Sequence, residues 1–152
     1  MRHYRVIALL RDASQGARWR AAGALPLVGD LDDRTSLARI SGLADAVLHL
    51  APPPDKGNSD TRTRNLLAAL EAGKSLPQRL IYVSTSGVYG DCAGERIDET
   101  RSPRPETARA RRRVDAERAL RAFGRRAGVT VAILRAPGIY AADRLPLERL
   151  QK

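Results

Sequence analysis

The sequence predicts one α/β domain over residues 1–152, with a parallel β-sheet and helices on both of its faces. Short apolar runs alternate along the chain with segments whose apolar residues recur at helical spacing. Alternation of strands and helices is typical of parallel sheets, because each crossover helix returns the chain to the same end of the sheet. The length suits a single domain, and no internal repeat or linker divides it.

Five apolar runs are predicted as strands buried on both faces, since they lack the alternation of half-exposed strands. They lie at residues 5–10, 24–28, 44–50, 79–84 and 129–134. Helices are expected between them, with acidic or hydroxyl residues at their first positions and glycine after several of them. The expected helices lie at residues 12–22, 35–40, 60–72 and 107–124, and a further one begins at Leu145.

The net charge of +10 is almost entirely due to arginine, and much of it lies in residues 101–126. A basic cluster can bind nucleic acid, but an arginine-covered solvated helix face explains it equally directly. We favour the solvated face, because aromatic residues make up only 4% of the chain and no nucleic-acid-binding motif accompanies the cluster. Nucleic acid is therefore an unfavoured partner.

Location and metal content are constrained by what the sequence contains. No signal-peptide pattern and no run of roughly 18 apolar residues is present, so we expect neither secretion nor a membrane partner. The single cysteine, Cys92, cannot form an internal disulfide and has no nearby histidine. These features indicate a cytoplasmic protein without a metal site.

Polar motifs follow the strands at the end where parallel sheets bind ligands. Residues 83–91 read Val-Ser-Thr-Ser-Gly-Val-Tyr-Gly-Asp, and residues 134–140 read Leu-Arg-Ala-Pro-Gly-Ile-Tyr. Together with Gly29-Asp30-Leu31, they resemble the NAD-dependent epimerase/dehydratase group of extended or atypical short-chain dehydrogenase/reductases. The resemblance covers nearly the whole chain, from the second strand of that fold onward. It implies a Rossmann-like doubly wound sheet, a nicotinamide cofactor and a small-molecule substrate.

The resemblance assigns the adenosine end of the cofactor to the first two strand ends. Arg11 takes the place of the residue that reads the ribose, and an arginine there favours NADP over NAD, although Asp12 beside it favours NAD. Asp30 and Leu31 match the adenine contacts, and Asp30 is equally well explained as a turn residue that caps a helix. Further cofactor contacts are expected from backbone at Leu50, Ala51, Pro52, Pro137, Gly138 and Ile139.

The resemblance also assigns the reacting end. Thr85 matches the family's catalytic hydroxyl, though a hydroxyl at a strand end can also serve the backbone, and Tyr89 either lines the cleft or packs. Aligning Glu117 with the family's glutamate places Arg109 and Arg113 at the tyrosine and lysine of Tyr-x-x-x-Lys. Arg113 can hold ribose hydroxyls. Arg109 stays protonated and cannot act as the general acid/base, so dehydrogenase activity is expected to be severely reduced. Tyr89 or Tyr140 could supply the proton instead.

The fold's first strand and its Gly-x-x-Gly-x-x-Gly turn have no counterpart in the sequence. That strand is central, so its absence predicts a gap between residues 5–10 and 44–50. Either a separate chain fills the gap, or the sheet closes up, or the chain is unstable, and the open edges could self-associate. The turn holds the cofactor phosphates, so NAD(P) binding is expected to be lost or weak. We interpret the chain as incomplete at both ends.

Three functions follow from these features. The first is an atypical NAD(P)-dependent epimerase, dehydratase or oxidoreductase whose activity is doubtful because of Arg109 and Arg113. The second is a non-catalytic nucleotide-binding sensor or scaffold. The third and least favoured is a basic nucleic-acid-binding protein.

Overall fold

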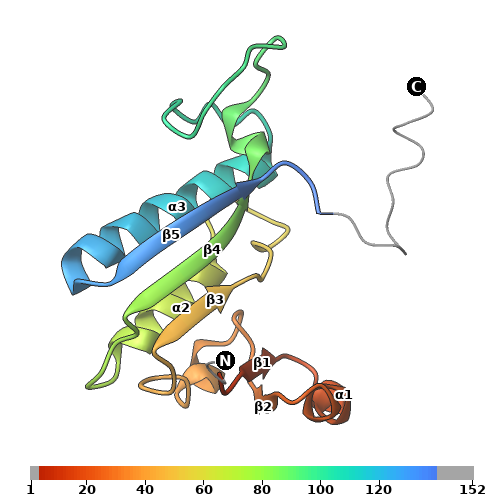
Figure 1. Ribbon diagram of the computed structural model, residues 1–152, viewed down its shortest axis with the longest axis vertical. Coiled ribbons are helices and arrows are strands. Elements are labelled where there is room, and N and C mark those ends of the chain that lie inside the picture. Colours follow the sequence, from red (N-terminus) through yellow and green to blue (C-terminus); the bar gives the residue numbers. More distant parts are fainter. Residues whose placement is uncertain (1–3, 140–152) are drawn as a thin grey trace.

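The computed structural model describes residues 4–139, which form two parallel sheets (Figure 1). The smaller sheet pairs β1 (Ile7–Leu10) with β2 (Leu25–Val28). The larger sheet has the order β3 (Ala46–His49), β4 (Arg79–Thr85) and β5 (Thr130–Ala136). Every strand pair is parallel. The predicted α/β class and all five strands are confirmed.

No backbone ladder joins β1 to β3 in the described residues, so the sheet is divided at that point. The resemblance places one missing strand there, between the strands that end at Leu10 and His49. The other pairings agree with that order, because β1 pairs with β2 and β3 with β4. The predicted gap is therefore confirmed, and the two halves of the sheet have not closed up.

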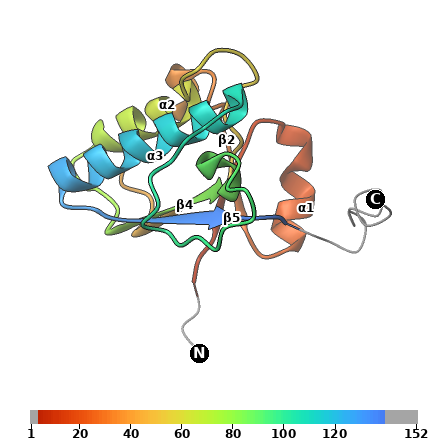
Figure 2. The same cartoon turned by 90° about the horizontal axis from the view of Figure 1, so that it is seen from above.

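Three α-helices connect the strands. α1 (Gly16–Ala21) is short, whereas α2 (Thr61–Glu71) and α3 (Ala108–Ala127) are long and lie together over one face of the larger sheet (Figure 2). Both long helices have an N-cap side chain: Asp60 accepts a hydrogen bond from the Thr63 amide, and Thr107 accepts one from the Ala110 amide. No helix of residues 4–139 combines the length and apolar character needed to cross a membrane.

Three 3₁₀ segments complete the local structure: Ala13–Gln15, Arg34–Leu37 and Ser86–Tyr89. The helix expected at residues 35–40 is only the second of these. Asp33 caps it, and Ser36 Oγ donates to the Asp30 and Asp33 carbonyl oxygens.

Helix α3 ends later than predicted. It continues through Gly124 to Ala127, and Gly128 ends it in the left-handed conformation at φ 68°. Gly124 is needed for packing, because a Cβ there would lie 2.8 Å from both the Val129 carbonyl oxygen and Val131 Cγ2. The glycine thus lets β5 approach the helix.

The main core lies between the two long helices and the larger sheet. Leu66 and Leu70 of α2 and Leu120 and Phe123 of α3 meet Tyr82 of β4 in this core. The opposite face is much less covered: Leu48 is 58% exposed and Leu134 is 53% exposed. Strands of a doubly wound sheet are normally buried on both faces. The expectation of helices on both faces is therefore not met for the larger sheet within residues 4–139.

Candidate functional site

The carboxyl ends of the strands carry the polar turns in which the cofactor was expected. Within each sheet these turns lie at one edge, because all strands run parallel. The smaller sheet presents Arg11 and Asp30, and the larger sheet presents Ala51, Thr85 and the segment after Ala136.

The turn after β2 is held by its own polar groups. Asp30 Oδ1 accepts from the Asp32 amide at 2.9 Å, and the Asp30 amide donates to Ser36 Oγ at 2.8 Å. Asp30 therefore has the turn role that was one of its two expected roles. Leu31 packs against the main core, and its carbonyl oxygen accepts from Asn65 Nδ2 at 2.8 Å. The adenine role of both residues stays a prediction.

An arginine on α2 connects this turn to the loop after β3. Arg62 donates from Nε and Nη2 to both oxygens of Asp32, at 2.8 and 2.6 Å, and from Nη1 to the Pro52 carbonyl at 3.1 Å. These bonds lower the pKa of Asp32 and raise that of Arg62. Sequence reasoning missed Arg62 and Asn65, although their helical spacing toward one side of α2 could have drawn attention to them.

Arg11 is exposed at the end of β1. Its charge contributes to the lowered pKa of Asp32, after the larger effect of Arg62, so Arg11 and the turn after β2 share one electrostatic environment. Leu50 and Pro52 are also exposed, and Ala51 between them is half-buried. The structure thus brings Arg11 and the turn after β2 near one another, and Arg62 adds Pro52 to this group.

Thr85 stands at the junction of β4 with the 3₁₀ turn that follows it. Its Oγ1 accepts from the Gly87 amide at 3.3 Å, which is the backbone role expected as an alternative to catalysis. The hydroxyl hydrogen remains available to another acceptor. The geometry therefore allows Thr85 both functions.

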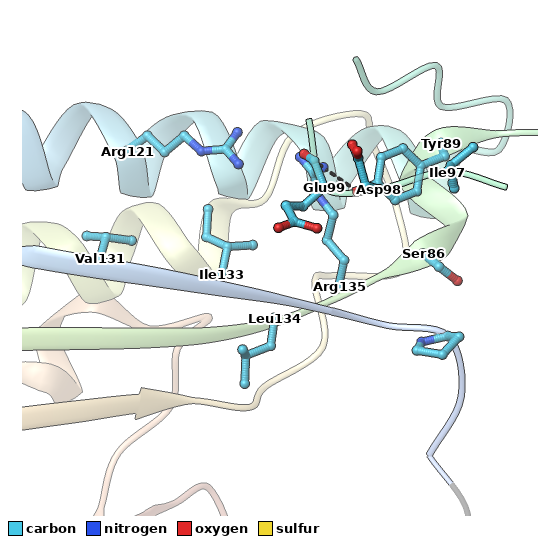
Figure 3. A pocket seen from close by; sticks show the side chains of 11 residues that line it. Ser86, Tyr89, Ile97, Asp98, Glu99, Arg121, Val131, Ile133, Leu134 and Arg135 are labelled. Atoms are coloured by element: carbon cyan, nitrogen blue, oxygen red, sulfur yellow. Dashed lines mark hydrogen bonds between the residues drawn. The ribbon is translucent and has the colours of Figure 1, made fainter. Parts of the chain in front are cut away.

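Tyr89 is buried and lies beside Arg135 in a polar network (Figure 3). Arg135 Nη1 donates to Tyr89 Oη at 2.7 Å, and the Arg135 guanidinium lies 4.8 Å from the centroid of the Tyr89 ring. Glu117 accepts from Arg135 Nη2 at 2.7 Å and from Ser84 Oγ at 2.7 Å. Of the two expected roles for Tyr89, the packing role is seen, and the side chain also borders an open pocket of about 670 Å³ beside β5.

The arginines at the Tyr-x-x-x-Lys positions lie in different surroundings. Arg109 is exposed on α3, whereas Arg113 is buried. Arg113 Nη1 donates to Tyr82 Oη at 2.9 Å and to the Val83 carbonyl at 2.8 Å. Burial raises the pKa of Tyr82 to about 12, so this phenol stays protonated near neutrality.

The solvated-face interpretation of the arginine cluster needs a correction. Arg109, Arg111 and Arg118 are exposed as expected, but Arg112 and Arg113 are buried. Arg113 reaches β4, whereas Arg112 Nη1 donates to the Gly57 carbonyl, in the loop after β3, at 2.7 Å. Neither was recognised as buried, because arginine rarely occupies the apolar stripe of a helix.

Three buried polar side chains, His49, Thr63 and Asp60, are joined by hydrogen bonds near the end of β3. Thr63 Oγ1 donates to Asp60 Oδ2 at 2.9 Å and lies 2.9 Å from His49 Nε2. Because the hydroxyl hydrogen is used on Asp60, Nε2 carries the imidazole proton and donates to Thr63. Burial lowers the pKa of His49 to about 4, so the ring is neutral.

The segment after β5 gives little enclosure. Pro137, Gly138 and Ile139 are exposed, and Tyr140 lies outside the described residues. Residues 4–139 contain no group of three His, Cys, Asp or Glu side chains that could hold a metal ion.

Solved structures of similar fold cover nearly all of the chain. A dTDP-glucose 4,6-dehydratase double mutant from Streptomyces venezuelae, solved with NAD and DAU bound, is 25% identical with a TM-score of 0.75, and the match covers 94% of this chain and 49% of that one. RMD from Pseudomonas aeruginosa, complexed with NADPH, is 25% identical with a TM-score of 0.64, covering 87% and 53% of the two chains.

A functionally unknown conserved protein from Silicibacter pomeroyi is 30% identical with a TM-score of 0.71, covering 96% of this chain and 48% of that one. The chain therefore spans about half the length of these proteins. No curated protein sequence matches it significantly. The family profile described as NAD dependent epimerase/dehydratase matches residues 1–149, and the chain belongs to that family.

Proposed function

We propose that this chain is the nucleotide-binding part of an atypical NAD(P)-dependent epimerase, dehydratase or oxidoreductase. The observation that carries the proposal is the linked pair of turns at the carboxyl ends of β2 and β3, which Arg62 connects through Asp32 and Pro52. Ligands of doubly wound folds bind at such strand ends. The family membership supports the same function.

The adenosine end of the cofactor would be held by Arg11, Asp30 and Leu31. One oxygen of Asp30, Oδ1, serves the turn, which leaves Oδ2 for an adenine amino group. Arg11 is exposed and would accommodate a 2′-phosphate, so we propose a preference for NADP. The backbone of Leu50–Pro52 and of Pro137–Ile139 would approach the rest of the dinucleotide.

The bound nicotinamide would supply hydride transfer, with Thr85 oriented toward the substrate and Arg113 toward the ribose. Arg109 occupies the position of the general acid/base and cannot exchange a proton near neutrality. We therefore propose that turnover is weak or absent. A sensor or scaffold that binds nucleotide without turnover is the second candidate, favoured by the same residue.

A chimeric protein distinguishes the enzyme from the non-catalytic sensor or scaffold. A strand, glycine turn and helix from a nicotinamide-binding family member are fused ahead of Met1, and calorimetry with NADPH and NADH follows. The proposal expects NADPH to bind more tightly, and Arg11→Glu to reverse the preference. A folded chimera that binds neither cofactor would refute it. Hydride transfer in the chimera would favour the enzyme, and binding without transfer would favour the sensor.

A further inference from the structure

Two consecutive arginines on α3, Arg112 and Arg113, are buried without a carboxylate partner. Each has only 7% of its surface exposed. Within residues 4–139, no acidic oxygen lies within the 4.0 Å salt-bridge distance of either guanidinium. Their partners are neutral: the Gly57 carbonyl for Arg112, and Tyr82 Oη with the Val83 carbonyl for Arg113. A buried cation normally has a counter-charge.

The same edge of both guanidinium groups is left without a partner. Nε and Nη2 form one side of the arginine fork, the side that grips a carboxylate or phosphate through two bonds. In Arg112 and Arg113 only Nη1 donates a bond, and each Nε is buried without a partner. Neither Nη2 is among the buried unpartnered atoms of the described residues, so each Nη2 keeps at least a small solvent-exposed area.

Other arginines of this chain show what that edge does when an acid is present. Arg62 places Nε and Nη2 on the two oxygens of Asp32, and Arg135 places the same two atoms on Glu117. The acid nearest in sequence to the buried pair is Asp115, which already accepts hydrogen bonds from the Asp60 amide and from Arg64. The buried pair thus lacks the oxyanion that Arg62 and Arg135 hold.

The location of the pair suits a ligand. Gly57 is in the loop after β3 and Val83 is close to the end of β4, so both side chains reach the carboxyl ends of neighbouring strands. Both residues also lie in the first two turns of a 20-residue helix, where the helix dipole adds positive potential.

From this geometry we propose that Arg112 and Arg113 form a binding site for a small oxyanion, a carboxylate or phosphate group, between the ends of β3 and β4. The site uses only residues of this chain and needs no nicotinamide cofactor. Failure of NADPH binding would therefore leave the oxyanion site untouched. Failure of oxyanion binding would leave the adenosine roles of Arg11, Asp30 and Leu31 untouched, although Arg113 is shared by the two proposals.

The test is calorimetry on this chain at low ionic strength, with inorganic phosphate in one arm and malonate in the other. We expect saturable binding at one site for at least one of the two anions, and the tighter arm identifies the anionic group. Arg112→Met and Arg113→Met should each weaken binding by about tenfold or more, because each removes one half of a buried charge contact.

Arg118→Met and Arg125→Met are the matched controls, since they remove the same charge from exposed positions of the same helix. We expect these controls to bind almost as the unaltered chain does. Equal weakening by the controls and the buried variants would assign binding to net charge and overturn the site. Absence of saturable binding by either anion would also overturn it.

A second measurement avoids variants that fail to fold. In NMR spectra of the unaltered chain, the Nε–H signals of the two buried arginines should shift saturably with added anion, while those of exposed arginines follow only ionic strength. Unchanged signals of the buried pair at saturating anion would contradict the proposal. Arg→Lys variants at the two positions assign the signals.

Discussion

Glu117 and Arg135 form the most enclosed ion pair of the described residues: Glu117 Oε2 lies 2.7 Å from Arg135 Nη2, and the side chains are 1% and 9% exposed. The pair joins α3 to β5, and Arg135 extends the contact to Tyr89. The Glu117 carboxylate raises the pKa of Arg135. This pair therefore joins α3, β5 and the Ser86–Tyr89 turn.

Glu117→Gln should destabilise the fold by about 3 to 5 kcal/mol, because it leaves the Arg135 guanidinium buried without its counter-charge. Urea unfolding of the variant measures the change. Glu95→Gln is the matched control, since the Arg101–Glu95 pair is more exposed and its loss should destabilise the fold much less. Equal losses in the free energy of unfolding would show that the Glu117–Arg135 pair stabilises the fold no more than the exposed pair does.

His49 predicts a dependence of stability on pH. Its pKa falls from 6.5 in the unfolded chain to about 4 in the folded protein because the ring is buried. Between these values the unfolded chain binds more protons than the folded one, so the free energy of unfolding rises with pH. The contribution is complete above pH 6.5 and is lost as pH falls toward 4, by about 3 kcal/mol in total.

Denaturant unfolding across this pH range checks the contribution of His49. His49→Gln keeps a donor for Thr63 but does not titrate, so the slope between pH 6.5 and 4 should become shallower. Carboxylate titration remains in both proteins and cancels in the comparison. If both proteins have the same slope, the neutral buried histidine is not the source of the pH dependence of the free energy of unfolding.

The bond between Arg62 and Asp32 should be measurable as a coupling energy. Asp32 is partly exposed, so the coupling is expected to be no more than about 1 kcal/mol. A double-mutant cycle with Asp32→Asn and Arg62→Met, analysed by urea unfolding, gives this value. A coupling of zero would mean that the bond between Arg62 and Asp32 does not help α2 to hold the turn after β2.

We propose that the chain self-associates through its open strand edges. Leu48 lies on β3, which pairs only with β4 among residues 4–139, and its side chain is largely exposed. Unpaired edges and exposed apolar residues favour association. Sedimentation velocity should show concentration-dependent association that Leu48→Lys reduces, whereas Leu76→Lys, at an exposed loop position, leaves it unchanged. A monomer at all concentrations would contradict the proposal.

The sequence was sufficient to predict the strands, the long helices and the division of the sheet, because these depend on local periodicity and on the order of strand motifs. Asp12 or Ser14 and Asp32 or Asp33 were the expected caps of the first two helical segments, and Asp12 and Asp33 cap them. The shortened helix after Asp33 was not predicted, since it depends on how Ser36 Oγ bonds the backbone.

The site was predicted less completely than the fold. Arg11, Asp30 and Thr85 could be placed at strand ends from motif order alone. Arg62 could not be assigned, because its contact with Asp32 spans 30 positions. The burial of Arg112 and Arg113 depends on how α3 rotates on the sheet, and charge alone indicated the opposite.

We propose that this chain carries the adenosine half of a nicotinamide site without the strand and glycine turn that the resemblance assigns to the phosphates. Titration calorimetry of NADPH and NADH into this chain tests it most directly. We predict no saturable binding of either cofactor at millimolar concentration. Micromolar binding of either one would contradict this account, because it would mean that the described strand ends hold the dinucleotide without that segment.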